Sequence, residues 1–172
     1  TVIVACAPVA VPLSRIAPST WSHGPCIGCA APLAALVTVS KNMSSIFSRL
    51  ASADFIFEAG PEDLSFKRKL LEQLQLLAPA HALLASNTSV IPITAIMQGL
   101  ARRERAVGTH WWNPPFLVPL VEVIETQWTS PAAVDFTMKL HADAGKKPAH
   151  VKKDVPGFIG NRLQHALWRE AI

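Results

Sequence analysis

Residues 55–85, with the sequence FIFEAGPEDLSFKRKLLEQLQLLAPAHALLA, decide the fold. The stretch opens on Phe55-Ile56-Phe57, a short apolar run that is typical of a buried strand. Pro61-Glu62-Asp63 then suits the first turn of a helix, which Pro79 ends. One apolar stripe of this helix consists of Leu64, Leu71, Leu74 and Ala78. A second apolar run at 82–85 follows, so the stretch predicts a βαβ unit of a mostly parallel sheet.

The same alternation continues downstream. Strands are predicted at 105–108, 120–124 and 149–152. Helices are predicted after Asn87-Thr88-Ser89, any of which suits a helix cap, from Ser130-Pro131 to Gly145, and over 158–172. The first of these helices carries Ile93, Ile96, Met97 and Leu100, and the last presents Ile159, Leu163, Ala166 and Leu167 on one face. The predicted fold class is therefore α/β, with helices on both faces of the sheet.

Composition and charge exclude several classes of protein. Half of the 172 residues are hydrophobic and only 16% are charged, which favours a globular domain over intrinsic disorder. The net charge of +4 comes from short, scattered basic groups, so no nucleic-acid partner is expected. No run reaches the roughly 18 apolar residues of a membrane span. Three cysteines, an odd number, indicate a reducing compartment, which is the cytoplasm or an organelle matrix.

His110 and Glu122 form the candidate catalytic pair. His110 falls at the carboxyl end of a predicted strand, where open α/β sheets bind ligands. Glu122 lies between Val121 and Val123, so its side chain should face away from the most apolar surface of its own strand. A carboxylate beside a histidine accepts the Nδ1 proton, fixes the tautomer and makes the other nitrogen a better base. The alternative is a hydrogen-bonded core histidine and an ordinary exposed glutamate.

Four motifs together resemble a known family. They are Ala85-Ser86-Asn87-Thr88-Ser89, the run from Gly108 to Pro114, Pro119-Leu120-Val121-Glu122-Val123-Ile124 and Pro156-Gly157-Phe158-Ile159-Gly160-Asn161-Arg162-Leu163. Their order and spacing over about residues 51–172 resemble the NAD-dependent L-3-hydroxyacyl-CoA dehydrogenase family. The resemblance implies that residues 51–154 form the second half of a Rossmann-type NAD-binding domain. It also implies that residues 155–172 begin the family's helical domain, with its first helix.

The resemblance also implies the roles of individual residues. His110 matches the catalytic base of the family, and Glu122 matches the carboxylate that orients it. Ser89 and Asn161 match polar side chains around the reacting oxygen, and both would equally suit plain helix caps.

Three further positions match residues that contact NAD in the family, alongside Ser89. They are Glu62, Lys67 and Asn113. For Glu62 and Lys67 the alternative is ordinary helix chemistry, with an acid in the first turn and a solvated base one turn later.

The implied activity is hydride transfer between NAD and the C3 hydroxyl or carbonyl of an acyl-CoA, as in fatty acid β-oxidation. Trp111 and Trp112 replace the family's aromatic pair, and we expect them to pack beneath the site. The run Asn113-Pro114-Pro115-Phe116 resembles relatives that oxidise small 3-hydroxy acids without coenzyme A, which gives a first alternative. A non-catalytic chain held by partner chains is a second alternative. A full-length member would form a homodimer, and the resemblance implies a small-molecule substrate with no membrane partner.

Residues 1–50 show no convincing period and no Asp or Glu, which predicts an irregular leader. The best candidate for a dinucleotide loop, Gly24-Pro25-Cys26-Ile27-Gly28, does not fit G-x-G-x-x-G. The expectation is a middle fragment of such an enzyme behind an unrelated or out-of-frame leader. His23, Cys26 and Cys29 offer a rival zinc site that lacks a defined fourth ligand, and no metal is assigned.

Overall fold

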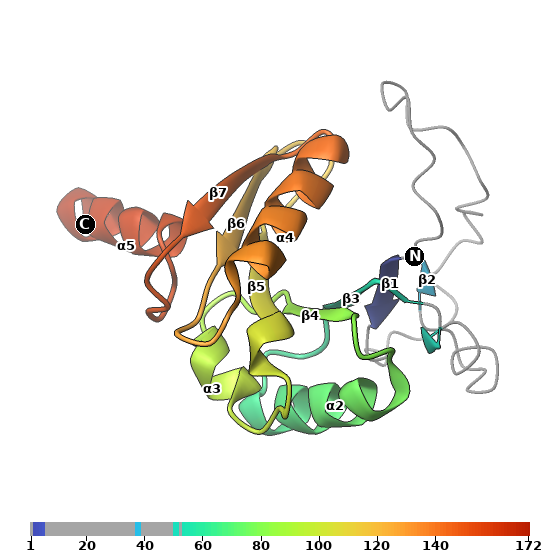
Figure 1. Cartoon of the computed structure of the whole chain (residues 1–172). Coiled ribbons are helices and arrows are strands. Elements are labelled where there is room, and N and C mark those ends of the chain that lie inside the picture. Colours follow the sequence, from blue (N-terminus) through green and yellow to red (C-terminus); the bar gives the residue numbers. More distant parts are fainter. Residues whose placement is uncertain (1, 6–36, 39–49, 52) are drawn as a thin grey trace, which may run out of the picture.

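The computed structural model describes residues 2–5, 37–38, 50–51 and 53–172. A seven-stranded sheet runs through it in the order β2-β1-β3-β4-β5-β6-β7 (Figure 1). The strands are β1 (Val2–Ala5), β2 (Val37–Thr38), β3 (Phe55–Glu58), β4 (Leu83–Ser86), β5 (Ala106–Trp111), β6 (Leu120–Ile124) and β7 (Lys147–Val151). The helices are α2 (Leu64–Leu77), α3 (Ile93–Met97), α4 (Pro131–Asp143) and α5 (Gly160–Ala171), and Arg103–Arg105 forms the 3-10 turn η2. The predicted α/β class is confirmed.

Neighbouring strands run parallel except for β5 and β6. The connection between these two, residues 112–119, is shorter than the dozen or so residues of a helical crossover, so the chain turns back on itself. The strand order reverses at β1, which has β2 on one side and β3 on the other. In open α/β sheets, ligands bind outside the carboxyl ends of the strands at such a reversal.

Strands β1 and β2 come from the segment 1–50, for which the sequence predicts irregular structure. That prediction is wrong for these two elements. Strand β1 pairs with β3 along its whole length, from Val2 opposite Phe55 to Ala5 opposite Glu58. Parallel pairing requires a partner that is distant in the chain, so the local pattern of the segment did not reveal it.

Helix α2 begins later than predicted. Asp63 is its N-cap, and the Asp63 carboxylate accepts a hydrogen bond from the Phe66 N–H at 2.7 Å. Glu62 therefore lies before the helix and not in its first turn, which removes the helix-dipole alternative for this residue. The predicted apolar stripe is confirmed at Leu71 and Leu74, which are buried. The helix ends before Pro79, as predicted.

Helix α3 is capped from a distant part of the chain. The predicted cap among Asn87-Thr88-Ser89 is wrong, because Pro92 occupies the N-cap position and makes no side-chain cap bond. The Asp154 carboxylate instead accepts hydrogen bonds from the N–H groups of Ile93, at 2.9 Å, and Thr94, at 2.5 Å. A carboxylate at a helix N-terminus satisfies orphan N–H groups and opposes the helix dipole.

Helix α4 follows its predicted bounds. Ser130 caps it, with its hydroxyl oxygen accepting from the Ala133 N–H, and Gly145 beyond its end has a φ of 76°. Helix α5 also forms as predicted, but its apolar residues Leu163, Leu167 and Trp168 are exposed. Within the described residues, none of the helices is long and apolar enough to cross a membrane.

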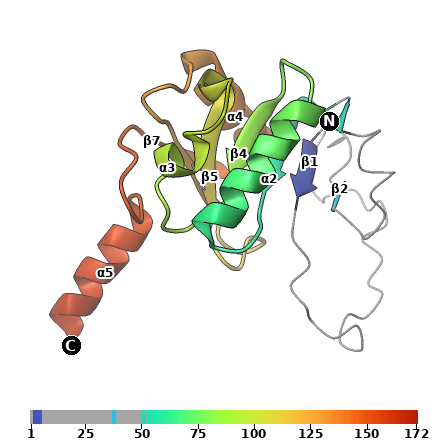
Figure 2. The same ribbon diagram turned by 90° about the horizontal axis from the view of Figure 1, so that it is seen from below.

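The buried residues form two clusters, one on each face of the sheet. Ile56, Leu71 and Ile96 belong to the first, beneath α2 and α3, and Phe55, Val121 and Ala133 belong to the second, beneath α4. Figure 1 and Figure 2 show these helices on the two faces, with α5 projecting away from the sheet. Side chains alternate between these two faces along a strand, so β3 and β6 are buried along nearly their whole length.

Candidate functional site

His110 and Glu122 face each other across the antiparallel strands β5 and β6. The His110 Nδ1 and the Glu122 Oε2 lie 2.7 Å apart, and the two residues are only 4% and 1% exposed. Val121 and Val123 belong to the cluster beneath α4, so Glu122 faces the opposite side of the sheet, as predicted. That side is also covered, which makes the alternative of an exposed strand glutamate wrong.

The Glu122 carboxylate is surrounded by hydrogen-bond donors. Oε2 also accepts from the Trp112 Nε1–H at 3.2 Å, and Oε1 accepts from the N–H groups of Ile159 and Gly160 at 2.9 and 3.0 Å. Burial works to raise the pKa of Glu122, but the bonds from His110, Gly160 and Ile159 outweigh it and hold the pKa below its ordinary value. Glu122 is therefore an anion at neutral pH.

The ionised glutamate determines the tautomer of His110. Since Glu122 can only accept, the proton of the neutral imidazole lies on Nδ1, and Nε2 carries the lone pair. Nε2 receives no hydrogen bond from the residues that the structure describes. The rings of Trp112 and Phe158 flank the imidazole, with ring centroids 5.4 and 5.7 Å from its own. The pair thus has the arrangement of a general base and its orienting carboxylate.

A left-handed turn delivers the main-chain donors to Glu122. Gly157 and Phe158 have φ angles of 76° and 51°, and Phe158 is only 1% exposed. A residue with a Cβ costs about 1–2 kcal/mol in this region, so the surrounding contacts must hold the turn. The turn directs the Phe158 ring toward His110 and places the N-terminus of α5 against the carboxylate.

The structure brings Ser89 and Asn161 together from 72 residues apart in the chain. The side-chain amide of Asn161 donates to the main-chain carbonyl of Ser89 at 2.8 Å. Neither residue forms the helix cap that was the alternative, since Ile159 occupies the N-cap position of α5 and α3 begins after Pro92. Ser89 lies at an exposed position.

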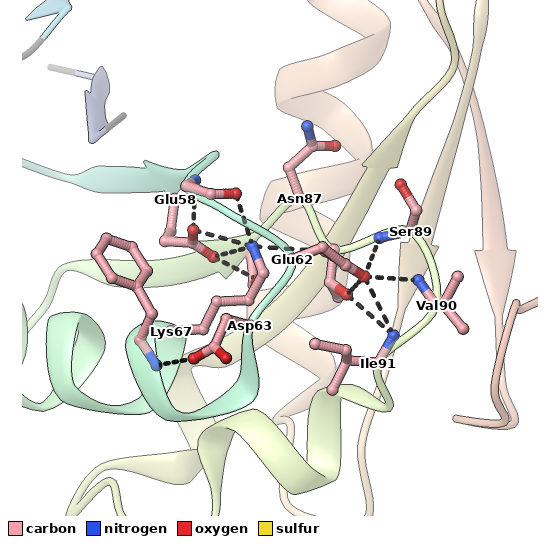
Figure 3. Close-up of polar contacts among 12 residues, drawn as sticks. Glu58, Glu62, Asp63, Lys67, Asn87, Ser89, Val90 and Ile91 are labelled. Carbon is pink, nitrogen blue, oxygen red and sulfur yellow. Dashed lines mark hydrogen bonds and ion pairs between the residues drawn. The ribbon is translucent and has the colours of Figure 1, made fainter. Parts of the chain in front are cut away.

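Glu62 binds the loop that carries Ser89 (Figure 3). Its Oε1 accepts from the Thr88 hydroxyl at 2.5 Å, and from the N–H groups of Ser89, Val90 and Ile91 at 3.0, 2.9 and 3.4 Å. Burial works to raise the pKa of Glu62, but the Thr88 and main-chain bonds and the charge of Lys67 outweigh it, so the pKa is lowered. The side chain keeps 40% of its surface exposed.

Lys67 is not the solvated base of the alternative interpretation. Its ammonium group is completely buried and lies 3.0 Å from the carboxylate of Glu58, which is also completely buried. It also donates to the Gly60 carbonyl at 3.3 Å and lies 3.8 Å from Glu62 (Figure 3). Glu58 accepts in addition from the Ser86 hydroxyl at 2.6 Å. The predicted contact of Lys67 with NAD stays a prediction.

Sequence reasoning missed Glu58. The available signal was its position directly after Phe55-Ile56-Phe57, because the carboxyl end of a parallel strand is where functional side chains gather. Strand pairing places Glu58 opposite Ser86, the corresponding end of β4. Asn113 follows β5 at an exposed position two residues beyond Trp111, and its predicted contact with NAD also stays a prediction.

Trp111 packs on the opposite face of β5 from His110. Its ring contacts Phe57, with the ring centroids 5.9 Å apart, and its Nε1–H donates to the His141 Nε2 at 3.1 Å. The His141 Nδ1 donates to the Thr137 carbonyl at 2.8 Å. Burial lowers the pKa of His141; the Thr137 carbonyl opposes the shift and the Lys146 charge adds to it. This histidine is neutral and structural.

In the part of the chain that the structure describes, no three His, Cys, Asp or Glu side chains lie close enough together to hold a metal ion. The rival zinc cluster of His23, Cys26 and Cys29 lies outside the described residues, as does the glycine-containing run at 24–28.

Comparison with known proteins gives a consistent set of relatives. Residues 30–155 match the sequence model of the family described as 3-hydroxyacyl-CoA dehydrogenase, NAD binding domain. An L-carnitine dehydrogenase of Streptomyces griseus is 46% identical over 129 residues, which cover 75% of this chain and 38% of that protein. A 5-formyl-3-hydroxy-2-methylpyridine 4-carboxylate 5-dehydrogenase of Mesorhizobium japonicum is 39% identical over 146 residues, covering 85% of this chain and 47% of that protein.

A solved structure agrees with these matches. The 3-hydroxybutyryl-CoA dehydrogenase of Escherichia coli superposes with a TM-score of 0.71 at 36% identity, covering 79% of this chain and 28% of that one. The present chain spans about two fifths to one half of the length of the two curated relatives.

Proposed function

We propose that the chain, which belongs to the 3-hydroxyacyl-CoA dehydrogenase family, carries the catalytic base of an NAD-dependent dehydrogenase that acts on a C3 hydroxyl group. The observation that carries the proposal is the buried pair of His110 and Glu122, joined by a hydrogen bond of 2.7 Å. A histidine with one nitrogen on an anion and the other without a partner among the described residues suits proton transfer, not core packing alone.

The proton moves through His110. In oxidation, the substrate hydroxyl gives its proton to Nε2 while the C3–H bond breaks, and the hydrogen leaves with both electrons as hydride, so that C3 becomes a carbonyl carbon. NAD, when bound, supplies the acceptor for that hydride. Glu122 remains ionised throughout and stabilises the positive charge that His110 gains. In the reverse direction His110 returns the proton to the oxygen.

Ser89 and Asn161 serve the reacting oxygen in this proposal. Ser89 is exposed, and its hydroxyl donates to the oxygen as negative charge develops there. Asn161 uses one amide N–H on the Ser89 carbonyl and has a second one to offer. The serine is therefore held through its main chain while its side chain stays available.

The positions of Glu62, Ser89 and Asn113 support a site for NAD at this edge of the sheet. Glu62, with 40% of its side chain exposed, and Ser89 lie beyond the carboxyl ends of β3 and β4, next to the reversal of strand order. Asn113 follows β5 at an exposed position. Glu62, Ser89 and Asn113 are the residues we propose to hold the cofactor. The Lys67 ammonium group is buried against Glu58 and lies 3.8 Å from Glu62. Lys67 would therefore support the cofactor site indirectly, by holding Glu62.

Two substrate classes follow from different observations. The family match favours a 3-hydroxyacyl-CoA. The 46% identity to an L-carnitine dehydrogenase favours a small free 3-hydroxy acid, since L-carnitine is itself a 3-hydroxy acid without coenzyme A. We propose the acyl-CoA as the first candidate and the small hydroxy acid as the second.

Turnover tests both candidates. The purified chain is mixed with NADH and acetoacetyl-CoA, and separately with NAD and L-carnitine, while the absorbance of NADH is followed. Turnover that is lost in His110→Ala, by about 100-fold or more as expected for a general base, supports the proposal. Turnover of equal rate in His110→Ala removes His110 as the base. No turnover in the parent chain favours the alternative of a non-catalytic chain.

A further inference from the structure

The turn that serves Glu122 is anchored at both ends by carboxylates. We define it as the 154–160 turn. At its far end the N–H groups of Ile159 and Gly160 bind Glu122, at 2.9 and 3.0 Å. At its near end Asp154 accepts hydrogen bonds from the Ile93 and Thr94 N–H groups of α3, at 2.9 and 2.5 Å. The near end of the turn is therefore bound to α3 and the far end to Glu122 of β6, so the position of the turn depends on both elements.

The residues between the anchors would not adopt this shape unaided. Gly157 and Phe158 both have positive φ angles, 76° and 51°, and phenylalanine disfavours that region. Two main-chain bonds assist, from the Gly157 N–H to the Val90 carbonyl at 3.3 Å and from the Phe158 N–H to the Val155 carbonyl at 3.0 Å. The Phe158 side chain also packs in the core cluster beneath α2 and α3. These contacts hold the centre of the turn, and Asp154 fixes its near end to α3. If Asp154 is removed, we expect the strained turn to loosen and the two N–H groups to bind Glu122 less firmly.

We propose that Asp154 is a positioning residue for the His110–Glu122 pair, which it serves by holding the 154–160 turn against α3. Asp154 makes no hydrogen bond to His110 or to Glu122, and it acts on them only through the turn. The inference rests on the proposed function of that pair. Its structural part, however, is tested without turnover.

The test uses ¹H–¹⁵N spectra and amide hydrogen exchange of the purified chain. In Asp154→Ala we expect faster exchange at Ile93 and Thr94, which lose their acceptor, and also at Ile159 and Gly160. The expected acceleration is at least about tenfold, because bonds to charged acceptors are lost. The indole N–H resonance of Trp112 should shift as well, since that group donates to Glu122. The matched control is Asp135→Asn, an exposed acid in α4.

The outcomes separate positioning from local capping. Faster exchange at Ile93 and Thr94, with Ile159, Gly160 and the Trp112 indole as in the control, would reduce Asp154 to a cap of α3 and overturn the proposal. If Asp154→Ala does not fold, Asp154→Asn takes its place, because its amide oxygen remains an acceptor without the charge. Exchange at Ile159 and Gly160 must then exceed that of Asp135→Asn, and equal rates overturn the proposal. An inactive parent chain bears on the proposed function alone.

Discussion

The carboxylate of Glu58 and the ammonium group of Lys67 lie 3.0 Å apart, and neither side chain is exposed to solvent. The pair joins the end of β3 to the first turns of α2, next to the strand reversal at which cofactors bind in such sheets. Two charges are stable there because Gly60 and Ser86 satisfy the remaining hydrogen-bonding capacity of Glu58.

Removing the lysine should therefore destabilise the protein strongly. Lys67→Met leaves a buried carboxylate without a counter-ion, and we expect the free energy of unfolding to fall by about 3–5 kcal/mol. Denaturant unfolding measures the change, with Lys69→Met on the exposed side of the same helix as the control. The double variant Glu58→Gln with Lys67→Met should recover much of the loss. A Lys67→Met variant as stable as the control contradicts the interpretation.

Glu122 should make stability sensitive to acid. Its pKa is lowered in the folded chain, so the unfolded chain binds protons more readily as the pH falls. Its contribution is complete above the ordinary glutamate pKa and is lost as the pH falls through the lower, folded value. We expect the difference in unfolding free energy between the parent and Glu122→Gln to shrink between about pH 6 and pH 3. A difference that does not vary with pH argues against this account.

His141 should have a similar effect at higher pH, for a different reason. Burial lowers its pKa in the folded chain, so acid favours the unfolded chain, in which the imidazole protonates freely. The parent should lose stability between about pH 7 and pH 5, and His141→Gln should flatten that slope. Thermal unfolding at several pH values measures it, with His165→Gln on α5 as the control. Identical slopes in the parent and His141→Gln would exclude His141 as the cause.

Gly160 leaves room for Trp112. A Cβ built at position 160 collides with the six-membered part of the indole ring. Alanine would otherwise favour the helix by about 1 kcal/mol. We nevertheless expect Gly160→Ala to lower the unfolding free energy by about 1–3 kcal/mol, because overpacking costs more. Combining it with Trp112→Phe should reduce the loss, and the single variant Trp112→Phe is the reference. A more stable Gly160→Ala would show that the ring has space to move.

Elements whose signals are local were predictable from the sequence. Helix α4 begins and ends where Ser130-Pro131 and Gly145 indicate, because caps and prolines act within one turn. Strands β3 and β6 coincide with apolar runs for the same reason. The start of α2 was misplaced by three residues, since Pro61, Glu62 and Asp63 all suit a first turn and only the Asp63 cap bond distinguishes them.

The sequence by itself determined the α/β class, the order of the elements from residue 53 onward and the pairing of His110 with Glu122, which rested on a strand pattern and on four motifs in order. Only the tertiary structure decided that Asp154 caps α3, that Glu58 neutralises Lys67 and that Asn161 binds Ser89. These contacts join residues of different elements, up to 72 positions apart. Hydrogen bonds and ion pairs depend on distances of a few ångströms, and the packing of the helices on the sheet sets those distances, not the spacing along the chain.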